Sequence, residues 1–437
     1  MLGNIAKKSK ESYQLKFLKL EIAARKNDNT LDDFVDVTNF VRSNGIGRLS
    51  KSIDTNDFTI GLYDQNNMTI LLDNSSGFFN SNSGLFENRI ENRSKVRVTA
   101  GYFDNNNLPI TNTNQIFSEI TFEGVISAEG AEKEAQNETV SYKVLSYISI
   151  MKSIKARSGV VTTGMTFQTA IFNLLNTFEI TQYLTVDISN INPYINLTID
   201  DPSPFEDIQL DEAINYLLLF SNSIFDIQNN EIIVKPRIES SEIKFQFYGK
   251  GSNFPSNIIS ITNHNPGQRR VITRIKFPFV SIPSFESSAA IQDRFGSKIK
   301  EINFPIVTDT SKLQTIANLI LDEFQFPKTE FKLTTSYIGE SVNLLDLVTI
   351  DNTGYVFDVD AARYGTAVYG TATYYEPIAG LKIYPNTGFK ILSIEHDYTR
   401  FTTTLKLREI GKGLFDGTID NVGSFYGNAL YGVSKYG

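Results

Sequence analysis

The stretch from Glu301 to Ile350 constrains the fold more than any other part of the sequence. Between residues 313 and 324 the apolar side chains recur at intervals of three and four, which places them on one face of a helix. Thr310 or Ser311 can cap the start of this helix. Pro327 ends it, because proline has no N–H to donate and pushes the preceding residue out of the α region. Strand patterns follow at 331–335 and 341–350. The stretch therefore predicts a helix packed across a β-barrel or β-sandwich.

The chain on both sides of this stretch is rich in strand patterns. Near the C-terminal end, apolar Phe401, Thr403, Leu405 and Leu407 alternate with polar neighbours, which is the period-2 pattern of a half-buried sheet. The earlier strand patterns lie at 15–22, 34–37, 58–63, 70–73, 95–102, 120–126 and 139–148. A mainly β protein is expected.

Residues 151–238 differ in character. Thr166 and Asp211 can each cap a helix whose apolar residues fall on one face. A β-hairpin pattern follows at 223–237, with its turn at Gln228-Asn229-Asn230. We therefore expect a small α/β domain inserted into the β-rich chain.

Length and composition limit the classes of function. A chain of 437 residues suggests about three domains, and 41 Lys and Arg against 49 Asp and Glu leave no basic block for tight DNA binding. With no cysteine, disulfides and zinc-thiolate sites are excluded. No apolar run reaches the roughly 20 residues that a membrane span needs. Residues 1–12 carry lysines but no apolar signal core, so they are expected to form an N-terminal arm.

Few residues suggest catalysis. The chain has two histidines, His264 in a turn pattern and His396 beside Asp397. Adjacent strand residues point to opposite faces, so we expect a structural role for His396 rather than an acid–base pair. A paired-carboxylate glycosidase stays open, since such carboxylates come from separate strands, although the chain has no tryptophan to stack on sugars.

Glycine and aspartate motifs do not reach the patterns of known sites. Gly45-Ile46-Gly47 and Gly249-Lys250-Gly251 lack the third glycine of a dinucleotide fingerprint, so we interpret them as turns. Asp358-Val359-Asp360 and the Asp416–Asp420 loop offer oxygen ligands without EF-hand spacing. No cofactor and no metal site are therefore expected.

The order of the elements is similar to that of baseplate-hub and tail-tip hub proteins of tailed bacteriophages. Asp293-Arg294-Phe295-Gly296 precedes a strand, the helix, the proline and a second strand. Three further segments carry the resemblance, and they are Ile70–Phe79, Val234-Lys235-Pro236-Arg237 and Leu344-Leu345-Asp346-Leu347-Val348-Thr349-Ile350-Asp351.

This resemblance implies a mainly β fold with an α+β insertion, built from two tail-tube-like β-barrel domains, a small α/β domain and a C-terminal tail. The first barrel would span 13–150, with 239–269 as strands that can complete it. The α/β insertion would span 151–238, the second barrel 270–412 with a helix at 310–326, and the tail 413–437.

In function, the resemblance implies a non-enzymatic virion protein, a homotrimeric hub at the tail tip. Three copies would place six barrels under the sixfold tail tube and join it to a threefold tip. The tube or a distal tail ring protein would lie above, a spike, fibre or tip protein below, and DNA would pass without specific binding. The alternatives are a β-rich receptor-binding or glycan-binding protein, a glycan hydrolase, or another ring component such as a distal tail protein.

A Tyr-Gly repeat suggests a contact surface. Glycine lets the backbone approach a partner closely, and tyrosine offers a rigid ring with a hydroxyl group. The repeat occurs within residues 364–375 and again, more loosely, in the C-terminal tail. The candidate interaction residues are Tyr364, Tyr369, Tyr374, Tyr426, Tyr431 and Tyr436.

Overall fold

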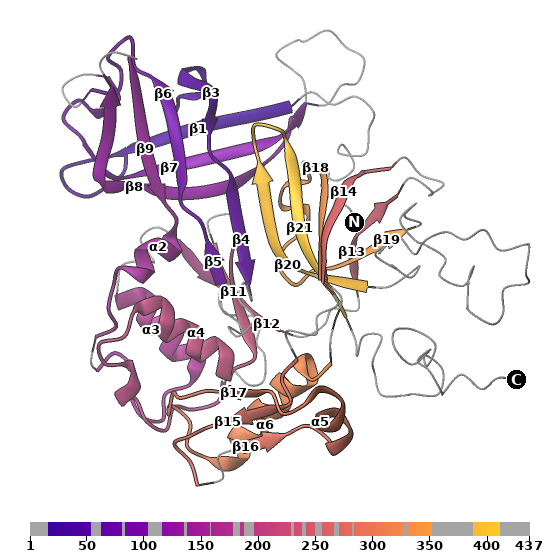
Figure 1. The fold of residues 1–437 in the computed structure, drawn as a ribbon. Coiled ribbons are helices and arrows are strands. Elements are labelled where there is room, and N and C mark those ends of the chain that lie inside the picture. The colour runs from indigo at the N-terminus through magenta and orange to yellow at the C-terminus, as the bar shows by residue number, and fades with distance from the viewer. Residues whose placement is uncertain are drawn as a thin grey trace, which may run out of the picture.

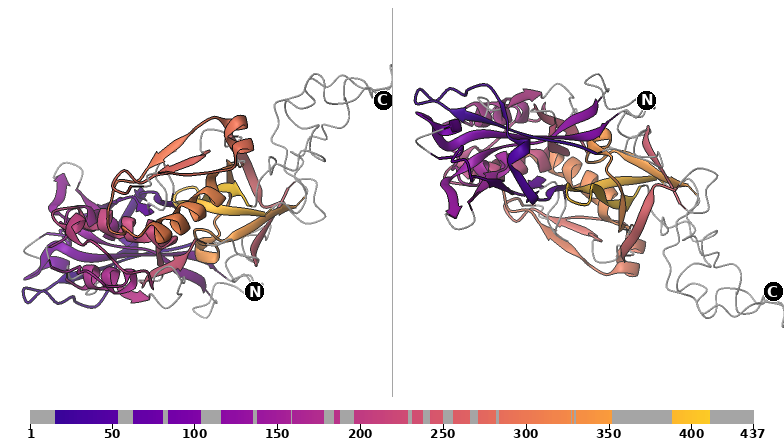
Figure 2. Two further views of the ribbon diagram at one scale, coloured as in Figure 1. Left: turned by 90° about the horizontal axis from the view of Figure 1, so that it is seen from below. Right: turned by 90° about the horizontal axis from the view of Figure 1, so that it is seen from above.

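The computed structural model shows a mainly β protein, as predicted. Among its described residues it has a seven-stranded sheet, an eight-stranded sheet and two three-stranded sheets. Figures 1 and 2 show the two large sheets beside one another and the helices on one side of both. The structure describes residues 16–53, 63–80, 84–103, 116–134, 138–157, 159–177, 184–187, 196–228, 231–237, 242–249, 256–265, 271–281, 284–326, 328, 330–351 and 388–410.

The seven-stranded sheet forms the first barrel. Its order is β2-β1-β7-β8-β9-β6-β3, and its outermost strands β2 and β3 are joined in the chain by the short η1 turn, so its two edges approach each other. Leu20, Ile70, Val98 and Tyr142 fill its interior. Its elements are β1 (Lys16–Arg25), β2 (Val35–Asp36), η1 (Thr38–Phe40), β3 (Val41–Ile46), β6 (Met68–Asp73), η2 (Gly84–Phe86), β7 (Ile90–Phe103), β8 (Ile116–Glu134) and β9 (Thr139–Leu145).

Gly45 lies in a bulged part of β3 and not in a turn. The register between β3 and β6 shifts between Val41 and Ile46. A Cβ at Gly45 would lie 2.4 Å from the carbonyl oxygen of Leu71, a distance that no side chain tolerates. The glycine is therefore explained by the close approach of two strands.

The inserted segment has helices that cover a small sheet of order β10-β12-β11. Thr166 caps α3 as predicted, since its hydroxyl oxygen accepts a hydrogen bond from the Thr169 N–H at 3.2 Å. Asp211 does not cap α4, because the helix already begins at Leu210 and Gln209 occupies the N-cap position. The elements are α2 (Tyr147–Lys152), α3 (Phe167–Thr177), β10 (Thr185–Asp187), η5 (Ser203–Phe205), α4 (Leu210–Phe220), β11 (Ser223–Gln228) and β12 (Glu231–Pro236).

The helix predicted after residue 309 is α6, and it buries the face that its spacing defined. Its cap is Asp309, whose carboxylate accepts from the Lys312 N–H at 3.0 Å, and not Thr310 or Ser311. A carboxylate is favourable there because the helix N-terminus carries positive partial charge. A small sheet of order β16-β15-β17 precedes it. The elements are β15 (Arg274–Lys276), β16 (Ser284–Glu286), α5 (Ala289–Phe295), β17 (Ile299–Glu301) and α6 (Thr310–Phe324).

The eight-stranded sheet forms the second barrel, with the main order β13-β19-β20-β21-β18-β14. Its outermost strands meet where the Tyr248 N–H donates to Asn257 Oδ1 at 2.8 Å and the Asn257 N–H donates to the Tyr248 carbonyl at 3.1 Å. Its elements are β13 (Ile243–Tyr248), β14 (Ile258–Asn265), β18 (Glu330–Ser336), η7 (Gly339–Ser341), β19 (Leu347–Asp351), β20 (Gly388–Asp397) and β21 (Thr402–Glu409).

Strands from the 239–269 region complete the second barrel, although we expected that they can complete the first. β13 pairs with β19, and β14 pairs with β18. In the first barrel, η1 joins the two outermost strands β2 and β3 along the chain. Phe245 and Phe247 of β13 are instead buried in the larger apolar core.

One hairpin crosses from the first barrel to the second. β4 (Leu49–Ile53) and β5 (Tyr63–Gln65) follow β3 directly, yet β4 pairs with β20 over the register from Ser393↔Ser52 to His396↔Leu49. β19 pairs with the other half of β20, at residues 388–390. The first part of the chain thus supplies part of the second sheet.

The two barrels share one strand order. Numbered along the chain with the two-residue strand β2 and the β4–β5 hairpin left out, the first barrel has β1, β3, β6, β7, β8 and β9, and the second has β13, β14, β18, β19, β20 and β21. Both lie in the order 1-4-5-6-3-2. The orientation of strand 1 differs, because β1 is antiparallel to β7 whereas β13 is parallel to β19. The chain therefore contains the same strand order twice, with strand 1 reversed in the second barrel.

Candidate functional site

The junction between the barrels is made of buried aromatic residues. The Tyr102 hydroxyl at the end of β7 donates to the carbonyl of Tyr337 at 2.7 Å, and the ring of Tyr102 meets Phe401 edge-on at 5.3 Å. The hydroxyls of Thr121 and Tyr398 are 2.8 Å apart. Burial raises the pKa of Tyr102, so its hydroxyl keeps the proton that it donates.

The crossing hairpin adds charged contacts to this junction. Arg48 pairs with Asp397 at 3.0 Å, and Lys51 lies 3.8 Å from Asp226 of the inserted segment. Lys51 and Asp226 are almost fully buried, and Lys235 also reaches Asp226 at 3.6 Å. The hairpin therefore ties both barrels and the insertion together.

His396 and Asp397 have separate structural tasks. Nδ1 of His396 lies 3.1 Å from the Thr403 hydroxyl, and burial, reinforced by the nearby Lys51 charge, lowers the histidine pKa to about 3. Asp397 accepts a hydrogen bond from the Arg400 N–H at 2.9 Å in the following turn. His396 is consequently neutral at ordinary pH and buried beside the aromatic junction.

A second charged cluster joins α6 to the second barrel. Glu323 of α6 accepts from Arg237 at 2.6 Å, binds Lys390 and lies 3.7 Å from Arg408. Burial opposes ionisation of Glu323, but these cations outweigh it and hold its pKa well below the usual range. The guanidinium of Arg408 also lies 4.5 Å from the centre of the Phe324 ring. This cluster fixes the end of β12, α6 and two strands against each other.

Exposed apolar side chains gather on strands at sheet edges. Val35 lies on β2, Ile243 and Ile259 on β13 and β14, and Ile299 on β17, and each of these strands ends the order of its sheet. Edge strands with exposed apolar residues are templates for pairing with another chain. The edge of β17 is therefore a candidate assembly surface, whereas β13 and β14 meet each other at Tyr248 and Asn257.

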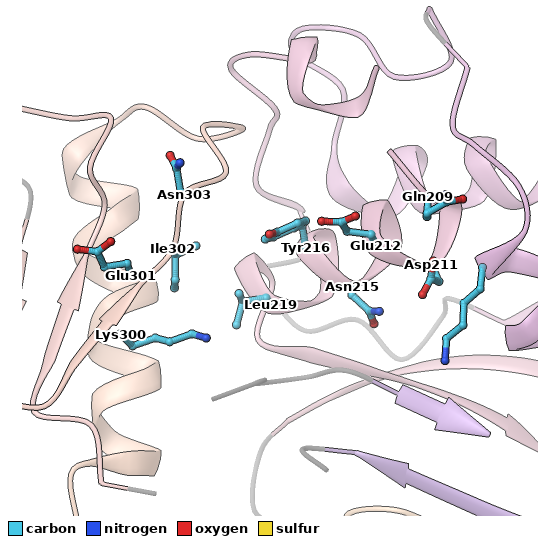
Figure 3. A pocket seen from close by; sticks show the side chains of 11 residues that line it. Gln209, Asp211, Glu212, Asn215, Tyr216, Leu219, Lys300, Glu301, Ile302 and Asn303 are labelled. Atoms are coloured by element: carbon cyan, nitrogen blue, oxygen red, sulfur yellow. The ribbon is translucent and has the colours of Figure 1, made fainter. Parts of the chain in front are cut away.

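A cleft of about 430 Å³ lies between α4 and the β17 segment. In Figure 3 the Lys300 side chain points across the cleft towards α4, and Asp211 and Glu212 point to different sides of that helix. Burial raises the pKa of Asp211 and lowers the pKa of Lys300. One wall is fixed by Tyr216, whose ring stacks on Phe304 at 3.8 Å. The two carboxylates do not face a common point as a glycosidase pair would.

The six candidate tyrosines Tyr364, Tyr369, Tyr374, Tyr426, Tyr431 and Tyr436 lie outside the described residues, as do the Asp358–Asp360 and Asp416–Asp420 loops. Within the described ranges no three His, Asp or Glu side chains come together as a metal site would require. No helix in those ranges is long and apolar enough to cross a membrane.

Sequence reasoning missed the junction residues. Tyr102 and Tyr337 are separated by 235 positions, and neither stands in a recognisable motif. The buried cations left a weak signal, because Lys390 stands between Phe389 and Ile391 in an apolar strand.

A scan against protein-family models found no match, and neither did a search of curated proteins. Solved structures do match. The tail protein from Neisseria meningitidis MC58 aligns with a TM-score of 0.54 and 11% identity over 91% of this chain and 98% of that chain. The 43 kDa tail protein of prophage MuSo2 from Shewanella oneidensis aligns with a TM-score of 0.50 and 9% identity over 90% and 97%.

Both alignments cover about nine-tenths of this chain. The predicted resemblance to phage tail proteins is confirmed at the level of the fold: this chain has the fold of phage and prophage tail proteins.

Proposed function

We propose that the protein is a structural component of a phage-like tail, a homotrimeric hub at the tail tip or baseplate. The observation that carries this proposal is the shared strand order 1-4-5-6-3-2 of the two barrels. A chain with two equivalent barrels presents six of them when three copies close into a ring. Such a ring matches a sixfold tube on one side and a threefold tip on the other.

The rigid junction supports this role. Two barrels that present pseudo-sixfold symmetry must keep a fixed angle to each other. The buried Tyr102–Tyr337 hydrogen bond and the crossing β4 strand hold that angle within one chain. The tail tube or a distal tail ring protein would bind above the ring, and a spike, fibre or tip protein below.

DNA would pass through the ring without specific binding. Phosphate contacts by Lys and Arg make proteins adhere to DNA, so the lumen is expected to carry few of them and a surplus of acidic and small polar residues. The net charge of −8 is compatible with this. At physiological salt the repulsion between acidic residues of the lumen and DNA phosphates extends only about 8 Å, so it acts only on DNA close to the channel wall. A continuous band of lysines and arginines around the channel would contradict DNA passage.

The test is the mass of the purified chain by light scattering across a range of concentrations, followed by negative-stain imaging. A hub gives three copies of 49.1 kDa and a ring with a central hole. A monomer at every concentration that binds cell-surface glycan would instead favour the receptor-binding alternative. A ring of six copies would favour another ring component such as a distal tail protein.

The Tyr/Gly-rich tail at 413–437 is proposed to dock on a neighbouring copy or on the next tip protein. Removal of everything after Gly413 should leave the trimer intact and weaken capture of the distal tip component in a pull-down. Unchanged capture would rule this docking out.

A further inference from the structure

The cleft beside α4 follows the edge of β17. This strand is the outermost of the order β16-β15-β17 and has no second neighbour strand among the described residues. Residues 300–303 line one side of the cleft, and α4 lines the other (Figure 3). Successive side chains of a strand point to opposite faces. A lining by four successive residues therefore means that the cleft runs along the edge of the strand and not over one face of it.

The main-chain groups on this edge are free to pair. On the side of β15, the Lys298 carbonyl accepts from the Arg274 N–H at 3.1 Å, and the Ile302 N–H donates to that strand at 2.9 Å. Main-chain groups of alternate residues point to the same edge, so those of Ile299 and Glu301 point away from β15. Among the described residues neither takes part in a main-chain hydrogen bond outside its sheet. Such an edge can take up an extended segment as an additional strand.

The charges around the cleft define which segment fits. Asp211 and Glu212 stand in the first turn of α4, and Glu212 is exposed. Lys152 also lines the cleft, but its ammonium group pairs with Asp64 at 2.7 Å. From the other wall, Lys300 points towards α4 (Figure 3). A fitting segment therefore carries basic side chains towards α4 and a small side chain beside Lys300.

Residues 6–10 of this chain have that pattern. The stretch Ala6-Lys7-Lys8-Ser9-Lys10 holds three lysines in four positions, a density of Lys and Arg that no other part of the sequence reaches. In an extended chain Ala6, Lys8 and Lys10 point to one side, and Lys7 and Ser9 point to the other. One side thus offers a small residue followed by two cations. These residues precede β1 and lie outside the described residues.

We propose that the N-terminal arm of one copy pairs with the edge of β17 in a neighbouring copy. Ala6 lies beside Lys300 in this arrangement, and Lys8 and Lys10 face Asp211 and Glu212. Because β17 is only three residues long and carries charged side chains, it resists indiscriminate pairing. The match of charges then selects the arm among other extended segments.

The arm comes from a second copy because its own cleft is at the far end of the molecule. β1, which follows the arm, begins at the junction between the barrels, where Lys16 Nζ lies 3.5 Å from the Arg400 carbonyl. Figure 1 shows this junction at the top and α4 with β17 at the bottom. The exchange between copies rests on the proposed homotrimer, which holds copies side by side, whereas binding of the arm to the cleft does not.

A cross-link tests the exchange. The chain has no cysteine, so A6C with N215C supplies the only two thiols, and Asn215 lines the cleft. A bismaleimide should join this double variant into species of two and three chains on a denaturing gel. A6C with T163C is the matched control, because Thr163 is exposed in the inserted segment and does not line the cleft. The control should stay at the mass of one chain.

A charge exchange tests the binding itself. A fluorescein-labelled peptide of residues 1–12 is titrated with the full-length protein and followed by fluorescence anisotropy. E212K should weaken binding by about tenfold or more, because Lys8 then meets a like charge. A K8E peptide should bind wild type as weakly and should regain affinity for E212K. A K7E peptide is the control, since Lys7 points away from α4, and it should bind wild type like the unchanged peptide.

A backbone variant tests the strand pairing. I299P removes an N–H that points to the open edge, where proline is tolerated within a sheet. It should keep the circular dichroism of wild type and lose both the cross-link and the peptide. I299V, which keeps the N–H, should retain both.

The outcomes separate this inference from the proposed hub. A monomeric wild type that binds the peptide overturns the homotrimer and supports the cleft as the site of the arm. A trimeric wild type that shows neither the cross-link nor peptide binding overturns the arm's docking and leaves the hub standing. Equal effects of K7E and K8E would overturn the strand pairing. Loss of both thiols at the mass of one chain would place the arm in its own cleft and overturn the exchange.

Discussion

Glu323 lies where α6, the end of β12 and two strands of the second barrel meet, and it is the carboxylate that Arg237, Lys390 and Arg408 share. Its side chain is 11% exposed, and those of the three cations are 5% exposed or less. Buried charges of this kind fix geometry more than they add stability, because desolvation offsets much of the attraction. Removing the charge of Glu323 lowers the free energy of unfolding strongly, because the three cations then remain buried without their shared carboxylate.

E323Q is therefore expected to lower the free energy of unfolding by about 3–5 kcal/mol in urea titrations. The control is E301Q. Glu301 pairs with Lys276 at 2.7 Å, but both side chains are well exposed, so that change should cost no more than about 1 kcal/mol. Equal effects of the two variants would contradict the role assigned to Glu323.

His396 predicts a loss of stability in mild acid. Its folded pKa of about 3 lies below the 6.5 of an unfolded histidine, so the unfolded chain takes up the proton first. The contribution of neutral His396 to the free energy of unfolding is complete above pH 6.5 and is lost as the pH falls towards 3. Between pH 6.5 and pH 5 the free energy of unfolding is expected to fall by about 2 kcal/mol.

NMR titration of the histidine rings provides the measurement. The resonance assigned to His396, identified by its absence in H396N, should not shift between pH 8 and pH 5. A midpoint near 6.5 would show that the ring reaches water, and the predicted acid sensitivity would then be wrong.

At the scale of elements, the β4–β5 hairpin and the ends of β7 and β20 decide how the barrels are joined. β4 pairs with β20 through four residue pairs, which makes the first part of the chain an integral part of the second sheet. Tyr102 adds the hydrogen bond that crosses the junction at 2.7 Å. The two barrels are therefore joined by backbone hydrogen bonds between β4 and β20 and by the side-chain hydrogen bond of Tyr102.

Y102F should lower the free energy of unfolding by about 1 kcal/mol or more, because it leaves the Tyr337 carbonyl buried without this donor. Y142F is the matched control. The Tyr142 hydroxyl is buried and has no hydrogen-bond partner among the described residues, so its removal should be neutral or stabilising. A neutral Y102F would mean that the junction does not depend on this bond.

At the scale of the whole molecule, two barrels, an insertion and the α6 region form one interlocked body. The larger apolar core draws on all parts of the chain from Ile53 to Leu407. The smaller core belongs to the first barrel but includes Tyr337, Tyr398 and Phe401 from the second. Neither barrel can open without exposing apolar residues of the other.

The described body is accordingly expected to unfold in one transition. Calorimetry and far-ultraviolet circular dichroism should give the same midpoint, since cooperative units unfold together when they share a core. Two resolved transitions would indicate barrels that are stable separately, and the junction would then be a contact between independent domains.

The sequence by itself determined the local elements. The spacing of Leu313, Ile316 and Leu321 predicted α6, and period-2 alternation predicted β21, because both patterns follow from the backbone repeat. Arg408 broke the second pattern: alternation placed it outward, yet it is buried beside Glu323. A residue 85 positions away supplies the countercharge, and local spacing holds no information about it.

Tertiary structure alone decided which strands share a sheet. The patterns of β4, β13 and β14 specify strands but not partners, because main-chain hydrogen bonds are the same for every partner strand. The partners were set by tertiary packing: β13 and β14 pair with β19 and β18 of the second barrel, where Phe245 and Phe247 are buried, and β4 crosses to β20. The Tyr102–Tyr337 junction and the repeated strand order follow from that pairing, which no single stretch of the sequence contains.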